Sequence, residues 1–286
     1  MTSYSFFPGC SLESTASDFQ MSTLAVARAL GISLEEIPGW TCCGSSAAHA
    51  SDHILSVSLP ARNLAVAESL NQDVVVCCAA CYARLASANL ELIANPEMRS
   101  QVFKTAGIDY SGSVKVRHFL NVLKEDVGLK EIRDSVERSL NGLKVACYYG
   151  CLLTRPKELS ILDDPENPQL LEQILEAAGA EPIEWPYKTE CCGASFSITR
   201  TETVKKLSGE ILRMAKASGA ECIAVACPLC QTNLDLRQED IEKASGEKIG
   251  LPVFYFTQLL GRALGIPDNE LGIGKLMTDP SAVLAK

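Results

Sequence analysis

The sequence has no excess of basic residues. In 286 residues, 26 Lys and Arg stand against 35 Asp and Glu, for a formal net charge of −9. Nucleic acids and anionic membrane surfaces bind proteins through clustered basic side chains, so this balance predicts neither as a partner. No apolar run approaches the roughly 18–20 residues of a membrane-spanning helix. The first eight residues also lack the basic and apolar segments of a secretion signal. We therefore expect a soluble, cytoplasmic protein with no direct membrane insertion.

Two familiar cofactor motifs are missing as well. The chain contains no C-x2-C-x2-C-x3-C run of the ferredoxin type and no glycine-rich fingerprint for a flavin or nicotinamide nucleotide. Any electrons that the protein uses must therefore reach it through a partner.

Cysteine, in contrast, is abundant, with 13 residues. Disulfide frameworks belong to small secreted domains, whereas cytoplasmic thiols are kept reduced. In a cytoplasmic chain, this many cysteines indicate metal binding or redox chemistry.

Ten of these cysteines form a five-cysteine pattern that occurs twice. In each copy a lone cysteine follows a turn glycine, a Cys-Cys-Gly triplet comes next, and a C-x-x-C motif closes the set. The gap from the second cysteine of the pair to the C-x-x-C motif is the same in both copies (43 to 78, 192 to 227). Because the two gaps have the same length, the two copies of the pattern did not arise by chance. The first set is Cys10, Cys42, Cys43, Cys78 and Cys81; the second set is Cys151, Cys191, Cys192, Cys227 and Cys230.

The other three cysteines have no counterpart in the repeat. Aligning the two sets puts Cys147 opposite Phe6, Cys77 opposite Ala226, and Cys222 opposite Asp73. These three are therefore predicted to be small buried hydrophobic residues.

Apolar runs of strand length alternate with helical segments through both halves, which predicts an α/β fold with mostly parallel sheets flanked by helices. We expect tandem, pseudo-repeated domains at 1–142 and 143–268 and a tail at 269–286, with a charged linker at 124–141. The expected strands are 3–7, 34–38, 74–76, 114–118, 143–148, 181–185, 222–226 and 253–256. The expected helices are 16–30, 48–70, 169–179 and 201–218, with others starting near 78, 119, 228 and 257.

Every repeated cysteine follows one of the predicted strands. The carboxyl ends of parallel strands share one edge of a sheet, so each set can converge on one metal centre. Gly44 and Gly193, after the cysteine pairs, suit a tight turn with positive φ that lets the backbone approach that centre. Zinc sites and cubane clusters saturate at four thiolates. Each set has five cysteines, so either one of them does not bind the centre, or the centre has an unusual shape and uses all five.

With these motifs, the sequence resembles the CCG-domain family, and a chain of two such domains resembles the B subunits of heterodisulfide reductases. The resemblance spans residues 3–265 and implies that each cysteine set binds a noncubane [4Fe-4S] cluster. It also implies that two facing clusters reduce a disulfide, either the coenzyme M–coenzyme B heterodisulfide or a related substrate. The implied partners are the other two proteins of such complexes, a ferredoxin-like [4Fe-4S] protein and a flavin-containing protein.

Three histidines are further candidates. His49 and His53 are spaced to share one face of the helix predicted after Cys43, where His49 could contact the substrate or donate a proton. His118, at the end of a strand, is interpreted as structural.

A few other side chains adjoin the cysteine motifs. Arg155, just beyond Cys151, could bind an anionic group of the substrate. Trp40 and Trp185 precede the two cysteine pairs and are predicted to cover the centres as apolar lids.

Two other functions stay open at this level. The same domains could form an electron-relay component of a membrane-associated respiratory oxidoreductase of the lactate or succinate type. They could also form a structural zinc protein, in which the spare cysteines have no role. The acidic composition and the missing ferredoxin motif favour the disulfide reductase.

Overall fold

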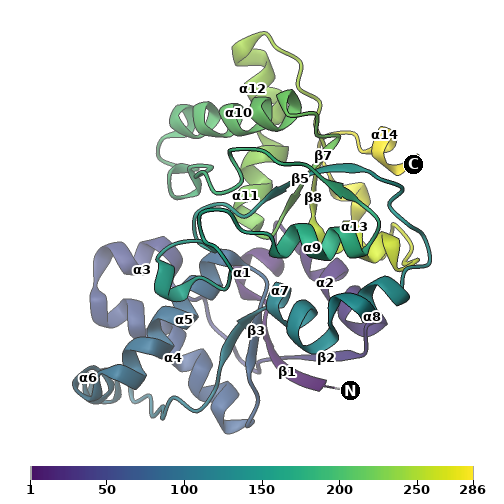
Figure 1. Cartoon of the computed structure of the whole chain (residues 1–286). Helices are drawn as coiled ribbons and strands as arrows, with labels where there is room; N and C mark the ends of the chain where they lie inside the picture. The colour runs from purple at the N-terminus through teal and green to yellow at the C-terminus, as the bar shows by residue number, and fades with distance from the viewer. Residues whose placement is uncertain (1, 286) are drawn as a thin grey trace.

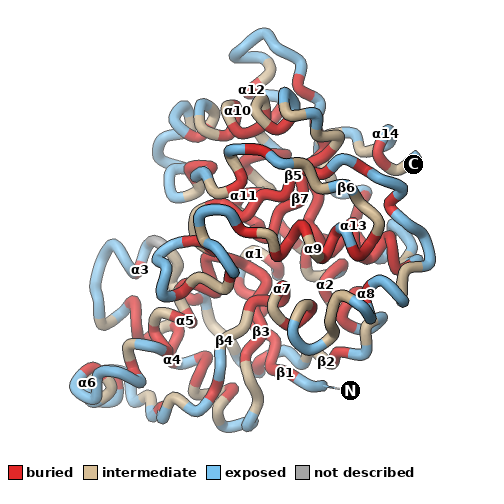
Figure 2. Tube along the Cα trace, in the orientation of Figure 1, coloured by how far each residue is buried: buried red, intermediate tan, exposed pale blue. Residues whose placement is uncertain are grey.

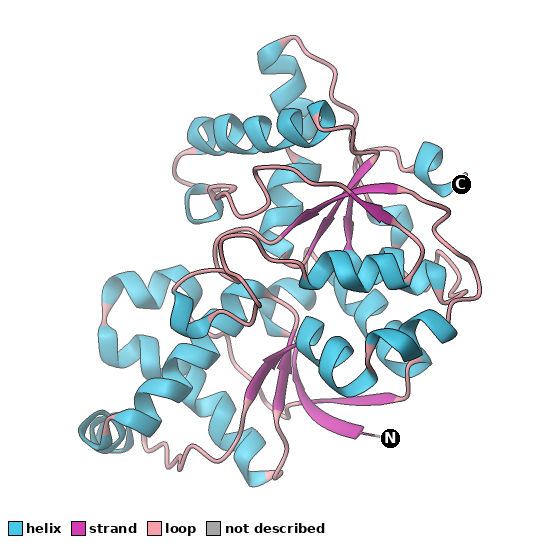
Figure 3. Ribbon diagram, in the orientation of Figure 1, coloured by secondary structure: helices cyan, strands magenta, loops and turns pink. Residues whose placement is uncertain are grey.

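The computed structural model describes residues 2–285, apart from the side chain of Ser46. The outer limits predicted for the first domain and the tail, Met1 and Lys286, lie outside this range. The chain forms two halves, each built on a four-stranded sheet (Figures 1 and 3). The first sheet has the order β2-β1-β3-β4, and the second has the order β6-β5-β7-β8. All neighbouring strands are parallel, so the predicted α/β fold is confirmed. The strands are β1 Thr2–Phe7, β2 Ile32–Glu36, β3 Val74–Val76, β4 Val116–His118, β5 Lys144–Tyr148, β6 Glu181–Pro182, β7 Cys222–Val225 and β8 Val253–Tyr255.

The central strands are apolar because helices cover both faces of each sheet. Every residue of β3 and β7 is buried, as expected for parallel sheets inside an α/β fold. Figure 2 shows these strands as the buried core of each half. β2 starts two residues before its predicted position, because Gly31, with φ of +72°, ends the preceding helix and Ile32 pairs at once with Thr2.

The helices surround the two sheets. In the first half they are α1 Gly9–Leu12, α2 Ser17–Ala29, α3 Ser45–Ser51, α4 His53–Ser69, α5 Ala79–Ala94, α6 Pro96–Ala106, α7 Phe119–Val122 and α8 Leu129–Asp134. In the second half they are α9 Leu170–Ala177, α10 Thr201–Ala217, α11 Pro228–Gln231, α12 Gln238–Ser245, α13 Phe256–Ala263 and α14 Ser281–Leu284. No helix within residues 2–285 combines the length and the apolar character needed to cross a bilayer.

The predicted single helix over 48–70 is wrong, because two helices meet at Asp52. This residue has extended backbone angles (φ −156°, ψ 133°), and its Oδ1 accepts a hydrogen bond from the backbone N–H of Leu55 at 2.7 Å. An aspartate in this role is a strong N-cap and starts a new helix. His49 and His53 therefore lie on α3 and α4, not on one helical face.

The first long helix of the chain, α2, packs against α13, the last long helix of the other half. The rings of Phe19 on α2 and Tyr255 at the end of β8 stack at 4.1 Å, and the hydroxyls of Ser22 and Thr257 are 2.7 Å apart. The predicted linker contains α8, which packs on α9, and the backbone N–H groups that follow it bind the carbonyl of Ala263.

The segment predicted as a tail also packs onto the protein. Leu271 and Ile273 are buried, and the ammonium of Lys275 donates to the hydroxyl of Ser17 at 2.6 Å. The two halves are thus joined by packing at several points along the chain.

Candidate functional site

Both cysteine sets lie at the carboxyl ends of the strands. In the first half, Cys10 follows β1, the Cys42–Cys43 pair follows β2, and Cys78 follows β3. The second half repeats this order after β5, β6 and β7. Loops separated by tens of residues in sequence therefore converge on one edge of each sheet, as the parallel topology requires.

The thiols approach one another in matching pairs. In each half the lone cysteine is next to the first cysteine of the Cys-Cys pair, and the second cysteine of that pair is next to the last cysteine of C-x-x-C. The Sγ–Sγ distances are 4.0 Å for Cys10–Cys42, 3.4 Å for Cys43–Cys81, 3.9 Å for Cys151–Cys191 and 3.6 Å for Cys192–Cys230. All thirteen cysteines, every one of them described, are free of disulfides.

Each set has a buried part and an open part. Cys43, Cys78 and Cys81 are buried, whereas Cys10 and Cys42 are exposed. The second set has a similar division, with Cys191 exposed, Cys151 partly exposed and the other three buried. Each set can therefore shield a centre on one side while leaving the other side accessible.

The two sets meet at the boundary between the halves. Cys78 and Cys227 are the first cysteines of the two C-x-x-C motifs. Cys227 raises the pKa of the Cys78 thiol, and Cys230 and Cys78 together lower the pKa of the Cys227 thiol. Helix α1, which contains Cys10, also contacts α11, which contains Cys230. The two sets therefore adjoin each other.

A cleft of about 440 Å³ opens beside this contact. His49 and Arg84 line it from the first half, and Cys151, Cys191 and Phe196 line it from the second. Two larger clefts, of about 550 Å³ each, lie elsewhere, and their described lining residues include no cysteine. We assign the site to the smaller cleft because it alone of these three is lined by thiols, and because its other lining side chains come from both halves.

Contacts with neighbouring thiols lower the pKa of some of the cysteines. Hydrogen bonds with Cys42 and Cys81 lower the pKa of Cys43 to about 3 against the opposing effect of burial. A hydrogen bond with Cys151 lowers the pKa of Cys191 to about 6. Thiolate is the form in which cysteine binds metals, so both residues favour the ligating state.

Glycines allow close backbone approach at four positions. Gly44 and Gly193 both have φ of +80°, as the turn prediction requires. Sequence reasoning missed the role of two others. A Cβ on Gly9 would lie 2.9 Å from the Sγ of Cys81, and one on Gly150 would lie 3.1 Å from the Sγ of Cys230. Their recurrence before both lone cysteines was the available signal.

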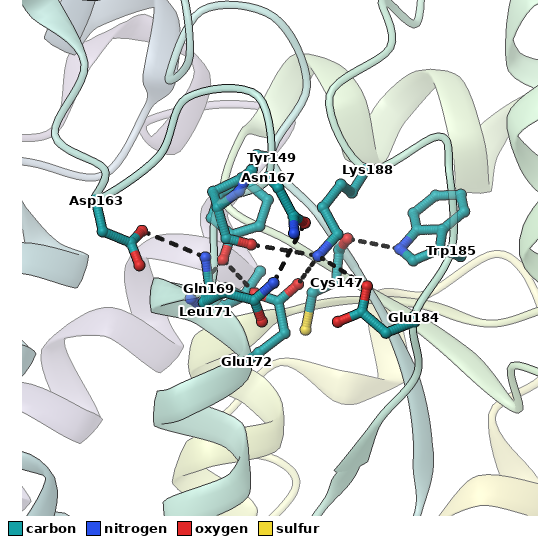
Figure 4. Close-up of polar contacts among 11 residues, drawn as sticks. Cys147, Tyr149, Asp163, Asn167, Gln169, Leu171, Glu172, Glu184, Trp185 and Lys188 are labelled. Carbon is teal, nitrogen blue, oxygen red and sulfur yellow. Dashed lines mark hydrogen bonds and ion pairs between the residues drawn. The ribbon is translucent and has the colours of Figure 1, made fainter.

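A buried polar network supports the ligand loops of the second set (Figure 4). The ammonium of Lys188 is 2.8 Å from the carboxylate of Glu172, which also accepts a hydrogen bond from the hydroxyl of Tyr149. The backbone N–H groups of Tyr149 and Gly150 both donate to the carbonyl of Lys188. The network therefore ties the turn before Cys151 to the loop before Cys191.

The histidines and Arg155 have separate environments. His49 lines the cleft, whereas His53 pairs with Glu91 at 2.7 Å on the surface. His118 is fully buried with its Nε2 2.9 Å from the carbonyl of Cys77, and burial lowers its pKa to about 4.

Arg155 is exposed and is not among the described cleft residues, although its charge helps to lower the pKa of Cys191. Arg84, which sequence reasoning did not select, lies in the cleft instead.

The tryptophans contact the aromatic residues that precede the lone-cysteine turns. The ring of Trp40 packs edge-on against Phe7 at 5.6 Å, and its Nε1 donates to Glu36. The ring of Trp185 lies 6.2 Å from Tyr148, and its Nε1 donates to the carbonyl of Cys147. These contacts hold each tryptophan ring against the end of the strand that precedes the lone cysteine of its half, β1 for Trp40 and β5 for Trp185.

The donor set fits an iron–sulfur centre by its chemistry, since each half offers five free thiols and thiolate sulfur is the usual ligand of such clusters. Within the described residues, no three Cys, His, Asp or Glu side chains surround a position suited to a single metal ion. The three unrepeated cysteines are all fully buried, in agreement with their prediction as hydrophobic residues.

Comparison with known proteins links the repeat to function. A family model described as a cysteine-rich domain, CCG, matches residues 4–86 and 145–235, which contain the two sets. The 8-methylmenaquinol:fumarate reductase membrane anchor subunit of Wolinella succinogenes is 37% identical, over 96% of this chain and 97% of its own. The B subunit of the ferredoxin:CoB-CoM heterodisulfide reductase of Methanosarcina mazei is 31% identical, over 100% of this chain and 97% of its own.

A solved structure shares the fold. A hypothetical protein from Helicobacter pylori matches with a TM-score of 0.77 at 11% identity. The match covers 97% of this chain, which spans about half (52%) of the solved chain.

Proposed function

Because the chain belongs to the family of cysteine-rich CCG-domain proteins, we propose that it is the disulfide-reducing component of a multisubunit oxidoreductase. The substrate is a small-molecule disulfide, such as the coenzyme M–coenzyme B heterodisulfide or a relative of it. The proximity of the two cysteine sets carries this proposal, because it places both beside one small cleft, which Cys151 and Cys191 line from the second set and Ser45 and Ala80 line next to the first.

The electron count favours paired centres. Reducing a disulfide takes two electrons and two protons and yields two thiols. Iron–sulfur centres, when bound, supply electrons one at a time. With one centre on each side of the cleft, each sulfur of the substrate can receive one electron, which avoids release of a free sulfur radical.

The proposed ligands of each noncubane [4Fe-4S] cluster are the five cysteines of its set. The buried cysteines of each set keep water from the inner side of the centre, and Cys151 and Cys191 face the cleft. Arg84 offers a positive charge to an anionic group of the substrate, and His49 offers a proton. Electrons come from partners, for which we propose a ferredoxin-like [4Fe-4S] protein and a flavin-containing protein of the same complex.

The test begins with anaerobic purification and measurement of iron and acid-labile sulfide. Two [4Fe-4S] clusters give about eight of each per chain. Cys192→Ala should lose about half of the iron and all disulfide turnover with a reduced dye. Cys222→Ala, at a buried cysteine outside both sets, is the matched control and should keep both. An iron-free protein, or a Cys192→Ala protein that still turns over, contradicts the proposal.

A second function is favoured by the relative from Wolinella succinogenes, which is the more similar of these two relatives and is named as part of a fumarate reductase. In this alternative the two centres relay electrons between a membrane quinol and a flavin-containing dehydrogenase. The dye assay separates the two functions. A relay protein keeps its iron but reduces no disulfide, and its reduced centres are reoxidised by a soluble quinone analogue.

A further inference from the structure

Asn233 is a fully buried asparagine whose side chain points at a proposed cluster ligand. Its Oδ1 accepts hydrogen bonds from the Oγ of Ser197 at 3.0 Å and from the Nε of Arg237 at 3.2 Å. With the oxygen engaged by two donors, the amide nitrogen must face the opposite way. There its Nδ2 lies 3.2 Å from the carbonyl oxygen of Cys192 and 3.6 Å from the Sγ of Cys192.

The surrounding groups hold this orientation. Arg237 also donates to the backbone carbonyl of Ser197 at 2.6 Å, which links the two donors to each other. The hydroxyl of Ser208 donates to the carbonyl of Cys192 at 3.2 Å and so holds that residue from α10. Asn233 lies in the π-helical turn Thr232–Leu236, directly after α11. Such turns are frequent at functional sites.

The repeat gives this position a counterpart in the first half. Aligning Cys78 with Cys227 places Arg84 opposite Asn233 (78 to 227 and 84 to 233 are the same offset). Arg84 lines the shared cleft together with Ser45 and Ala80, which adjoin the cysteines of the first set. Each half thus has a nitrogen-bearing side chain three residues after C-x-x-C. In the second half it is directed at Cys192, and in the first it lines the cleft beside the set.

We propose that these two residues set the reduction potentials of the two centres, Asn233 through a neutral N–H···S hydrogen bond to Cys192 and Arg84 through a full positive charge in the cleft beside the first set. A reduced centre carries one more negative charge than an oxidised one. A donor or cation beside a ligand sulfur stabilises the reduced form and raises the potential. The inference rests on the iron–sulfur centres of the proposed function but not on the identity of the substrate.

The test measures midpoint potentials of both centres by electron paramagnetic resonance during a redox titration. Cys43→Ala and Cys192→Ala proteins, each retaining one centre, assign the signals. Asn233→Leu keeps the branched shape of the side chain and removes the donor. It should lower the potential of the second centre by about 59 mV, a tenfold change in the oxidised-to-reduced ratio of a one-electron couple, and leave the first centre unchanged.

Arg84→Gln should lower the potential of the first centre more than that of the second, and Arg84→Lys, which keeps the charge, should restore it. Asn89→Leu is the matched control, because Asn89 is a buried asparagine that bonds Tyr110 and Val114 instead of a cysteine. It should leave both potentials unchanged.

If Asn233→Leu fails to load iron, Ser197→Ala provides the milder test. It removes one of the two donors that orient the amide and should lower the same potential by a smaller amount. Full iron loading with unchanged potentials in Asn233→Leu, or in Ser197→Ala where the first variant does not load, overturns the inference. Absence of iron from the unmodified protein overturns the proposed function instead.

Discussion

At the scale of single residues, Gly9 combines a left-handed backbone with contact to a ligand. Its φ is +70°, and a Cβ would sit 2.9 Å from the Sγ of Cys81. Gly9→Ala should therefore displace this thiol and weaken the first centre. We expect loss of about half of the iron, with an unfolding free energy lowered by roughly 1–3 kcal/mol, measured by metal analysis and chemical denaturation.

Gly31 provides the matched control for this change. It has nearly the same φ, +72°, but no atom within 4 Å of an added Cβ. Gly31→Ala should therefore carry the backbone strain alone and retain full iron. Equal iron loss in both variants would show that backbone strain, and not the contact with Cys81, explains the effect.

His118 should make stability depend on pH. Its pKa of about 4 lies below the ordinary value of 6.5 because the ring is buried. Between these pH values the unfolded chain binds a proton that the folded chain does not, so stability falls as the pH falls through this window. The loss from pH 7 to pH 5 should be about 2 kcal/mol, given about 1.4 kcal/mol per pKa unit.

The measurement is denaturant unfolding of the wild type and His118→Gln at the two pH values. Glutamine can replace the hydrogen bond to the carbonyl of Cys77 but does not titrate, so the variant should lose less stability on acidification. Parallel pH profiles for the two proteins would show that His118 does not account for the dependence.

At the scale of elements, the buried Lys188–Glu172 pair holds two ligand loops together. Both side chains are at most 5% exposed. Removing one partner of such a pair leaves an uncompensated buried charge, which typically costs about 3–5 kcal/mol. Lys188→Met should lower the unfolding free energy by this amount and release iron from the second centre before the first. Thermal unfolding and metal analysis measure the two effects.

The double variant Lys188→Met/Glu172→Leu removes both charges. It should recover much of the stability, because no buried charge is then unpaired. Lys243→Met is the surface control, since Lys243 pairs with Glu239 on an exposed face of α12 and such solvent-screened pairs contribute little to stability. A Lys188→Met effect no larger than that of this control would contradict the supporting role.

The sequence predicted the succession of parallel strands along the chain and the convergence of the cysteines, because both follow from the repeat. Other features depend on particular contacts. The break at Asp52 depends on a local one, in which this side chain caps α4 and the preceding helix ends. The roles of Gly9 and Asn233 depend on which thiol lies opposite, and spacing does not encode that. Arg155 was chosen because it follows Cys151 in sequence, whereas Arg84 reaches the cleft from the other half of the protein.

At the scale of the whole molecule, packing between the halves sets how far apart the two cysteine sets lie. Helices α1 and α11, which contain Cys10 and Cys230, meet at this boundary, and α2 and α13 form another part of it. The stacked rings of Phe19 and Tyr255 are fully buried there. Under the proposed function, we expect their packing to link association of the halves to electron exchange between the two centres.

Phe19→Ala tests this link. Truncating a buried phenylalanine costs about 3–5 kcal/mol, and here the cavity opens between the halves. We expect the iron content to remain, because Phe19 belongs to neither cysteine set. The magnetic coupling between the two reduced centres should weaken as their mean separation grows, and disulfide turnover should fall with it.

Phe103→Ala, at an exposed ring on α6, is the control and should change neither quantity. Unchanged coupling in a destabilised Phe19→Ala protein would mean that contacts nearer the cysteines alone fix the geometry of the pair.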